Sequence, residues 1–339
     1  MKIESNQTVL LCYQPDKIMM VKDYCYSSKF KEKRAEIMKQ NRSTVYNGFV
    51  GPSAGRKLRK MITCWSESIE LFNEQNKVVS NAKKKKLVFI TLTLSDEQKH
   101  DDLFIKRKML NRFILLIQKK YSVKHYIWKA EKQFNGRMHF HLIVDTFIDM
   151  KDVQSEWNAI QDSFGYLDAY KTKFGKSNPP STHIELYDSS EKAREYAIKY
   201  MSKKEMSKIE ACNVVKGRVW GCSDSLRNLR LFDSSESPKI IETLVKWSEK
   251  GRISSISDDF YALYRLDTKS FLKDLFPDVY SNYVGYYLSI YDELYVKQIP
   301  CQRDDLVNSQ QITKPVDKVF KPVQLDLFEV DISRDYHFD

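Results

Sequence analysis

The sequence predicts an α+β protein built on a central, largely antiparallel sheet with flanking helices. Three observations predict it. Residues 87 to 204 alternate between strand and helix patterns in the order β-α-β-β-α-β-α, two successive strands are joined by a tight hairpin signal, and helical material precedes and follows this region. Sequential strands connected in this way favour antiparallel pairing with helices on one face.

The first strand is expected at LVFITLTL, residues 87 to 94, which is apolar and β-branched. A helix is expected over residues 102 to 120, because apolar residues recur there at intervals of three and four. The next strand is HYIWKAEK, residues 125 to 132. The turn signal FNG, residues 134 to 136, then leads into a strand within GRMHFHLIVD, residues 136 to 145.

A second helical stripe consists of Val153, Trp157, Ile160 and Phe164, and it stops at Gly165, a residue type favoured at helix C-caps.

The sequence THIELY, residues 182 to 187, predicts a short strand. Asp188 and Glu191 resemble a capping box that opens a helix through about Lys204. The complete order favours a ferredoxin-like or RNA-recognition-motif topology.

Four segments are expected along the chain. Residues 1 to 85 form a basic, partly helical N-terminal extension, and residues 86 to 230 form the central domain. Residues 231 to 300 form a helical and aromatic C-terminal region, and residues 301 to 339 form a flexible acidic tail.

The formal net charge of +11 is unevenly distributed. Residues 1 to 86 contain 18 Lys and Arg against 8 Asp and Glu, whereas residues 301 to 339 contain 5 against 8. A basic front and 13% aromatic residues suit nucleic acid, because cations pair with phosphates and aromatic rings stack on bases. Binding of duplex origin DNA by the basic front is one hypothesis.

The six cysteines are scattered and contain no C-x-x-C pair, which argues against a disulfide framework or a structural zinc site and favours a reducing compartment. The sequence shows no signal-peptide pattern and no apolar run of membrane-spanning length. We therefore expect a cytoplasmic protein of a bacterium or of a phage-infected host, without a membrane partner.

His139 and His141 are separated by one residue, so a strand directs both imidazoles to the same face of the sheet. The pair suits a metal, and it also fits two exposed or hydrogen-bonded histidines. A third ligand is needed, and Glu131 is the candidate because the hairpin brings its strand beside both histidines. Glu131 could instead pair with Lys132 or Arg137. A His/His/Glu set with open positions suits Mg²⁺ or Mn²⁺ acting on a phosphodiester.

The segment EYAIKYMSKK, residues 195 to 204, supplies a nucleophile candidate. In a helix, steps of three and four place two phenols and two ammonium groups on one stripe. Nearby cations stabilise a phenolate, which an isolated tyrosine does not readily form. The alternative is that the tyrosines only pack this helix on the sheet. The four candidates are Tyr196, Lys199, Tyr200 and Lys203.

The segments LVFITLTLS, GRMHFHLIVD and YAIKYMSKK resemble, in this order, the three motifs of HUH endonucleases. The third has the Y-x-x-K-Y-x-x-K form of the two-tyrosine rolling-circle replication initiators of single-stranded DNA phages and plasmids. The resemblance covers about residues 87 to 204, and GRVWGCSDSLR, residues 217 to 227, resembles a segment that follows the third motif in some initiators. It implies an antiparallel sheet of about five strands, with the metal site on its open face and the tyrosine helix alongside.

The resemblance also implies a metal-dependent, site-specific endonuclease and ligase that acts on single-stranded origin DNA. Mg²⁺ or Mn²⁺ held by His139, His141 and Glu131 polarises the scissile phosphate. Tyr196 or Tyr200 attacks it, and the products are a 5′-phosphotyrosine link and a free 3′-hydroxyl. The lysines of the stripe steady negative charge. The sequence leaves open which tyrosine cuts first.

Two host enzymes are expected as partners. A polymerase is needed to extend the 3′-hydroxyl. A helicase is needed because FGKS, residues 174 to 177, lacks the first glycine of a phosphate-binding loop: position 170 is Tyr170.

The tail contains a further signal, because QLDLF resembles the pentapeptide with which many bacterial proteins bind the replicative sliding clamp. A short docking motif in a polar tail is accessible to a partner. The alternative is an amphipathic segment that folds back on the protein. The motif consists of Gln324, Leu325, Asp326, Leu327 and Phe328.

Other functions stay open from the sequence alone. A relaxase or transposase of the HUH type would use the same chemistry, although tyrosines that are paired and follow the histidines favour an initiator. A non-catalytic single-strand nucleic-acid binder would keep the basic and aromatic residues, but it would have no need to combine His139 and His141 with Glu131. A zinc-stabilised structural domain is disfavoured by the scattered cysteines.

Overall fold

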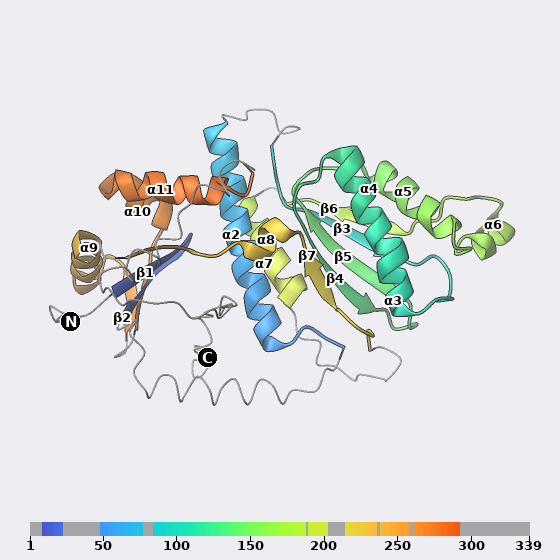
Figure 1. Cartoon of the computed structure of the whole chain (residues 1–339), viewed down its shortest axis with the longest axis horizontal. Coiled ribbons are helices and arrows are strands. Elements are labelled where there is room, and N and C mark those ends of the chain that lie inside the picture. Colours follow the sequence, from blue (N-terminus) through green and yellow to red (C-terminus); the bar gives the residue numbers. More distant parts are fainter. Residues whose placement is uncertain are drawn as a thin grey trace, which may run out of the picture. The chain divides into compact units, whose positions relative to one another are not determined.

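A computed structural model of the chain contains two five-stranded antiparallel sheets with helices packed against them (Figure 1). The α+β class is therefore confirmed. The structure describes residues 9–22, 48–76, 84–187, 189–202, 214–235, 238–257 and 261–291.

The central sheet has the strand order β6-β3-β5-β4-β7, and each neighbouring pair is antiparallel. Four of its strands lie where the sequence predicts strands. The fifth, β7, comes from the segment 217 to 227, for which we predicted no strand. The strands are β3 (Val88–Thr93), β4 (Tyr126–Lys132), β5 (Met138–Val144), β6 (Thr182–Glu185) and β7 (Trp220–Cys222).

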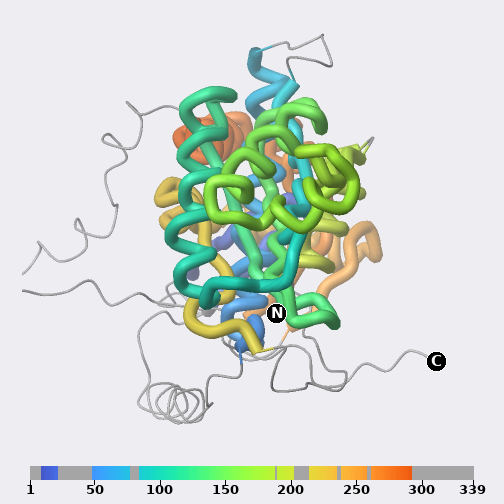
Figure 2. The backbone as a smooth tube through the Cα atoms, turned by 90° about the vertical axis from the view of Figure 1, so that its right-hand side faces the viewer, coloured from blue at the N-terminus to red at the C-terminus, as the bar shows by residue number. Residues whose placement is uncertain are grey.

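One face of this sheet is apolar and is covered by α4 and α5, which lie side by side (Figure 2). The alternation of β5 directs Phe140 to this face, where it contacts Trp157, and Trp157 in turn contacts Phe113 with ring centroids 5.8 Å apart. All three rings are fully buried. The helical segments between the strands are α3 (Asp102–Phe104), the π-helical η1 (Ile105–Leu110), α4 (Asn111–Tyr121), α5 (Met150–Asp162) and α6 (Asp168–Phe174).

The opposite face carries the histidines and is covered by α7 (Ser190–Ser202), which packs against the long helix α2 (Pro52–Gln75). Alanines on α7 permit close packing, since Ala193 and Ala197 are buried in the core. Asp188, the predicted N-cap of this helix, lies outside the described residues. The hydroxyl of Ser189 accepts a hydrogen bond from the Lys192 amide, as an N-cap side chain does.

The second sheet has the order β8-β1-β2-β10-β9, again antiparallel. Its strands are β1 (Val9–Gln14), β2 (Lys17–Lys22), β8 (Phe232–Ser235), β9 (Ser254–Ser257) and β10 (Tyr261–Arg265). The remaining helices are α8 (Asp224–Asn228), α9 (Pro238–Glu249), α10 (Thr268–Leu275) and α11 (Pro277–Leu288), of which α11 packs against α2.

The terminal segments are thus helical in part, as expected, but they also contribute a whole sheet that the sequence did not predict. Strand β1 pairs with β8 and β2 pairs with β10, so the first described residues are held by residues more than 200 positions later. Among the described residues, no helix is long and apolar enough to cross a membrane.

Candidate active site

The face of the central sheet beneath α7 is organised in rows of side chains, because residues paired across neighbouring strands point to the same side. The rows bring together residues far apart in the sequence and place charged and imidazole groups next to one another. The first row consists of Glu131, His139 and Thr93; the second of Lys129, His141, Thr91 and His183; and the third of Ile127, Ile143, Phe89 and Glu185.

His139 is held by the hydroxyl of Thr93, which lies 2.9 Å from its Nδ1 atom. The tautomer with a proton on Nδ1 donates to this hydroxyl and leaves the Nε2 lone pair available to a ligand. Burial, together with the neighbouring His141, lowers the pKa of His139 to about 4, although Glu131 acts in the opposite direction. The imidazole is therefore neutral at physiological pH, which is the form that binds metals.

His141 lies beside His139, with ring centroids 4.6 Å apart, and its Nε2 atom is 3.3 Å from a carboxylate oxygen of Glu131. Burial acts to raise the pKa of Glu131, but the hydrogen bond from His141 and the charge of Lys129 outweigh it, so the net shift is downward. Glu131 is ionised, and the three predicted ligands are neighbours on one sheet face.

Lys129 is the additional charged group of the site. Its side chain is 3% exposed, and its ammonium pairs with Glu131 and donates a hydrogen bond to the backbone carbonyl of Tyr200 at 3.1 Å. The ammonium neutralises Glu131 in this arrangement and connects β4 to α7.

The donor types, two imidazoles and a carboxylate, suit a divalent cation. In the arrangement described, however, the carboxylate is already paired with Lys129 and His141. Accordingly, within the described part of the chain no group of three or more His, Cys, Asp or Glu side chains is arranged to hold a metal ion. The composition of the donor set fits the ion, whereas its paired arrangement leaves the metal site a prediction.

Tyr200 and Tyr196 lie on α7 above this face and stack on each other with centroids 4.1 Å apart. Tyr200 is 36% exposed, and its ring lies 5.7 Å from that of His141. Tyr196 is half-buried and packs on Phe89, with centroids 4.8 Å apart. The two phenols are therefore adjacent, and Tyr200 is the one whose ring contacts a histidine of the site.

Tyr196 has a second set of neighbours that the sequence analysis did not single out. The ring of Tyr187 lies 4.7 Å from it, and the Tyr187 hydroxyl donates to the Glu185 carboxylate at 2.9 Å. His183 lies on the other side of that carboxylate, with Nε2 3.4 Å from Oε1. Burial, followed by hydrogen bonding and charge from Glu185, strongly raises the pKa of Tyr196. Alternation within the predicted strand THIELY could have indicated that His183 and Glu185 share a face.

The other predicted residues are less informed by the structure. Lys199 is exposed on α7, one residue before Tyr200. Lys203 lies outside the described residues, as does the QLDLF motif, residues 324 to 328.

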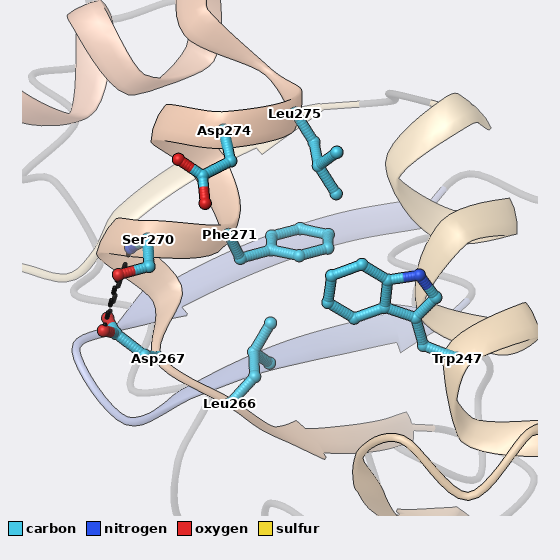
Figure 3. Close-up of a pocket in the computed structure, with 7 residues that line it drawn as sticks. All are labelled: Trp247, Leu266, Asp267, Ser270, Phe271, Asp274 and Leu275. Atoms are coloured by element: carbon cyan, nitrogen blue, oxygen red, sulfur yellow. Dashed lines mark hydrogen bonds between the residues drawn. The ribbon is translucent and has the colours of Figure 1, made fainter.

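A hollow on the second sheet is separate from this site (Figure 3). Trp247 and Phe271 form its apolar walls, and Asp267 and Asp274 supply carboxylates. Asp267 accepts hydrogen bonds from the amide and hydroxyl of Ser270, so it acts as the N-cap of α10. A hollow lined by carboxylates and apolar groups repels phosphate, and we therefore look for chemistry at the histidine face instead.

Comparison with known proteins points to the same region. Residues 87–205 match a family model of replication-associated proteins, the ORF2 group. This segment runs from β3 to the end of α7 and contains Glu131, both site histidines and both tyrosines. No curated protein and no solved structure matches the chain. The family match supports a replication-associated protein of the rolling-circle initiator type, with a role in replication initiation.

Proposed function

We propose that the protein is a two-tyrosine HUH endonuclease that starts rolling-circle replication by nicking single-stranded origin DNA and later rejoining it. One observation carries the proposal: the exposed phenol of Tyr200 lies beside His141, on the sheet face that also carries His139 and Glu131. A packing tyrosine has no need of this neighbourhood. The family match over the same residues favours an initiator over a relaxase or transposase.

In the proposed reaction His139, His141 and Glu131 hold Mg²⁺ or Mn²⁺, which supplies positive charge to the scissile phosphate. The Tyr200 oxygen attacks the phosphorus, a phosphotyrosine bond forms to the 5′ side, and the bond to the 3′ oxygen breaks. The 3′ oxygen leaves with a proton from water. Because one phosphodiester replaces another, the energy of the bond is kept for rejoining.

The stacking of the two tyrosines supports successive reactions at one site. While one tyrosine holds the parental 5′ end, the other is close enough to attack the regenerated origin. Exposed Lys199, and Lys203 by its sequence position, would add positive charge near the phosphate.

The proposed partners follow from this reaction. The 3′-hydroxyl needs a host polymerase, and exposure of the single strand needs a host helicase. The basic residues 1 to 86 are proposed to bind duplex DNA at the origin. Deletion of residues 1 to 80 should lower origin affinity, and unchanged affinity would exclude that role.

We also propose that QLDLF binds the bacterial sliding clamp, which would bring the clamp to the new 3′ end. A peptide of residues 319 to 333 should bind purified clamp, and a peptide in which Leu327 and Phe328 are both alanine should not. Equal binding by the two peptides would exclude the motif.

The test of the nicking function uses single-stranded fragments of the DNA that flanks the protein's own gene. The protein with Mn²⁺ should cut one fragment at one position, and addition of a second fragment should yield a rejoined product. Chelator or His139→Ala should abolish both products. His100→Ala is the matched control, since this imidazole stacks on Phe104 away from the site. Tight binding without cleavage would favour the non-catalytic single-strand binder.

A further inference from the structure

The two tyrosines of α7 differ in their polar surroundings. Tyr200 is near His141, whereas Tyr196 is near the carboxylate of Glu185, with which its hydroxyl has a hydrogen-bonding interaction. Both tyrosines stack on each other, so this difference arises over a short distance. It places an imidazole next to one phenol and a carboxylate next to the other.

Glu185 is held in position from both sides. Its Oε2 atom accepts the hydroxyl proton of Tyr187 at 2.9 Å, and its Oε1 atom lies 3.4 Å from Nε2 of His183. Glu185 lies on β6 directly opposite Phe89 of β3, and the Phe89 ring packs on Tyr196. The rigid sheet therefore fixes the distance between the carboxylate and the second phenol.

A carboxylate in this place can take a proton from Tyr196, because its side chain is only 35% exposed and its oxygens face hydroxyl and imidazole donors. Tyr196 does not ionise by itself, since burial and the negative charge of Glu185 raise its pKa. Proton transfer that accompanies attack avoids a free phenolate and is the usual means by which a weak nucleophile is activated.

We propose that Glu185, oriented by His183 and Tyr187, is the proton acceptor for Tyr196, so that the second tyrosine of the site is activated independently of the first. This inference rests on the proposed nicking function and adds to it a catalytic residue for one of the two cleavage reactions. Tyr200, which lies beside His141, is then the nucleophile that does not need Glu185.

The proposed step balances as follows. The Tyr196 O–H bond breaks and its proton passes to the Glu185 carboxylate, while the phenolic oxygen forms a bond to the phosphorus. The bond between phosphorus and the 3′ oxygen breaks, and that oxygen takes a proton from water. The protonated Glu185 later returns its proton to water.

The experiment measures covalent protein–DNA adduct in two single-tyrosine backgrounds of the full-length protein, on the fragment that the wild type cuts, with Mn²⁺ present. In the Tyr200→Phe background only Tyr196 can react, and Glu185→Gln should slow adduct formation about 100-fold. In the Tyr196→Phe background the same change should alter the rate less than about twofold. Glu185→Asp should restore part of the rate in the first background.

Glu195→Gln is the matched control, because it removes an exposed carboxylate adjacent to Tyr196 in the sequence and should have no effect in either background. Equal slowing by Glu185→Gln in both backgrounds would indicate a structural role and overturn the proposal, as would no slowing in either. If neither background formed an adduct with Glu185 intact, the nicking function itself would fail and the inference with it.

Discussion

The Lys129 ammonium donates a hydrogen bond at 3.1 Å to the backbone carbonyl of Tyr200 and at the same time pairs with the Glu131 carboxylate. Lys129 is almost fully buried, so both interactions are shielded from water. A single side chain therefore connects a proposed metal ligand on β4 to the helix that carries the proposed nucleophile.

Replacement of Lys129 tests this connection. Lys129→Met should leave Glu131 buried without its cation and should lower the free energy of unfolding by about 3 kcal/mol in chelator. Mn²⁺ should then stabilise the variant more than the wild type, because in the wild type the ion competes with the ammonium for Glu131. Thermal melts with Mn²⁺ and with chelator measure both effects.

The matched control is Lys119→Met, since Lys119 is exposed on α4. Its unfolding should change little, and Mn²⁺ should act on it as on the wild type. An equal rise in Tm with Mn²⁺ for Lys129→Met and for the wild type would show that the ion and the ammonium do not compete.

Gly221 in β7 closes the edge of the central sheet. A Cβ atom at this position would lie 2.7 to 2.9 Å from three atoms of the Trp128 indole. Gly221→Ala should therefore displace β7 or Trp128 and lower the free energy of unfolding by about 1 to 3 kcal/mol. Urea unfolding followed by tryptophan fluorescence measures the loss.

Gly51→Ala serves as its control, because a Cβ there has no atom within 4 Å and the backbone is extended. It should destabilise less than Gly221→Ala. If the two variants were equally stable, the close approach at Trp128 would not constrain β7.

The central sheet was largely predictable because its signals are local. Periodicity two fixed the face of His139 and His141, and the turn signal with Gly136 at φ +78° joined β4 to β5 in the register that puts Glu131 opposite His139. These interactions lie within a few residues of one another, so the sequence carries them openly.

The second sheet was not predictable in the same way. Strand β1 pairs with β8, and residue Leu11 pairs with Ser234, so the information for this contact is split between distant segments. Strand β9, SSIS, is polar and exposed along its length and shows no apolar alternation. Sequence patterns alone cannot pair such strands.

The role of Lys129 in the site was likewise hidden. By alternation Lys129 shares a face with Glu131, but only the fold shows that the ammonium points to α7 and meets the Tyr200 carbonyl. Thr93, interpreted from the sequence as a support for the sheet, also bonds His139 directly. A backbone partner on a distant helix leaves no signal in the sequence.

Glu67 on α2 gives the fold a specific pH dependence. Burial, and then the charge of Glu70, raise its pKa to about 7, while Tyr283 and Lys269 act against the shift. The folded state therefore holds a proton between pH 4.5 and 7 that the unfolded state releases, so stability falls as the pH rises through this window. Above pH 7 the full cost of about 3 kcal/mol is present.

Glu67→Gln removes this cost. Urea unfolding should give little difference from the wild type near pH 4.5 and a more stable variant at about pH 8.5. Glu242→Gln, at an exposed position of α9, should show no such gain. A constant difference between Glu67→Gln and the wild type at all pH values would mean that Glu67 does not titrate with a raised pKa.

The central claim is that a tyrosine of α7 becomes covalently joined to single-stranded DNA. We would incubate the protein with single-stranded fragments from around its own gene, with Mn²⁺ or chelator, and separate the products on a denaturing gel. The account predicts a metal-dependent shifted band that persists in Tyr196→Phe and in Tyr200→Phe but is lost in the double variant and in His139→Ala. The absence of an adduct on every fragment, despite tight DNA binding, would contradict it.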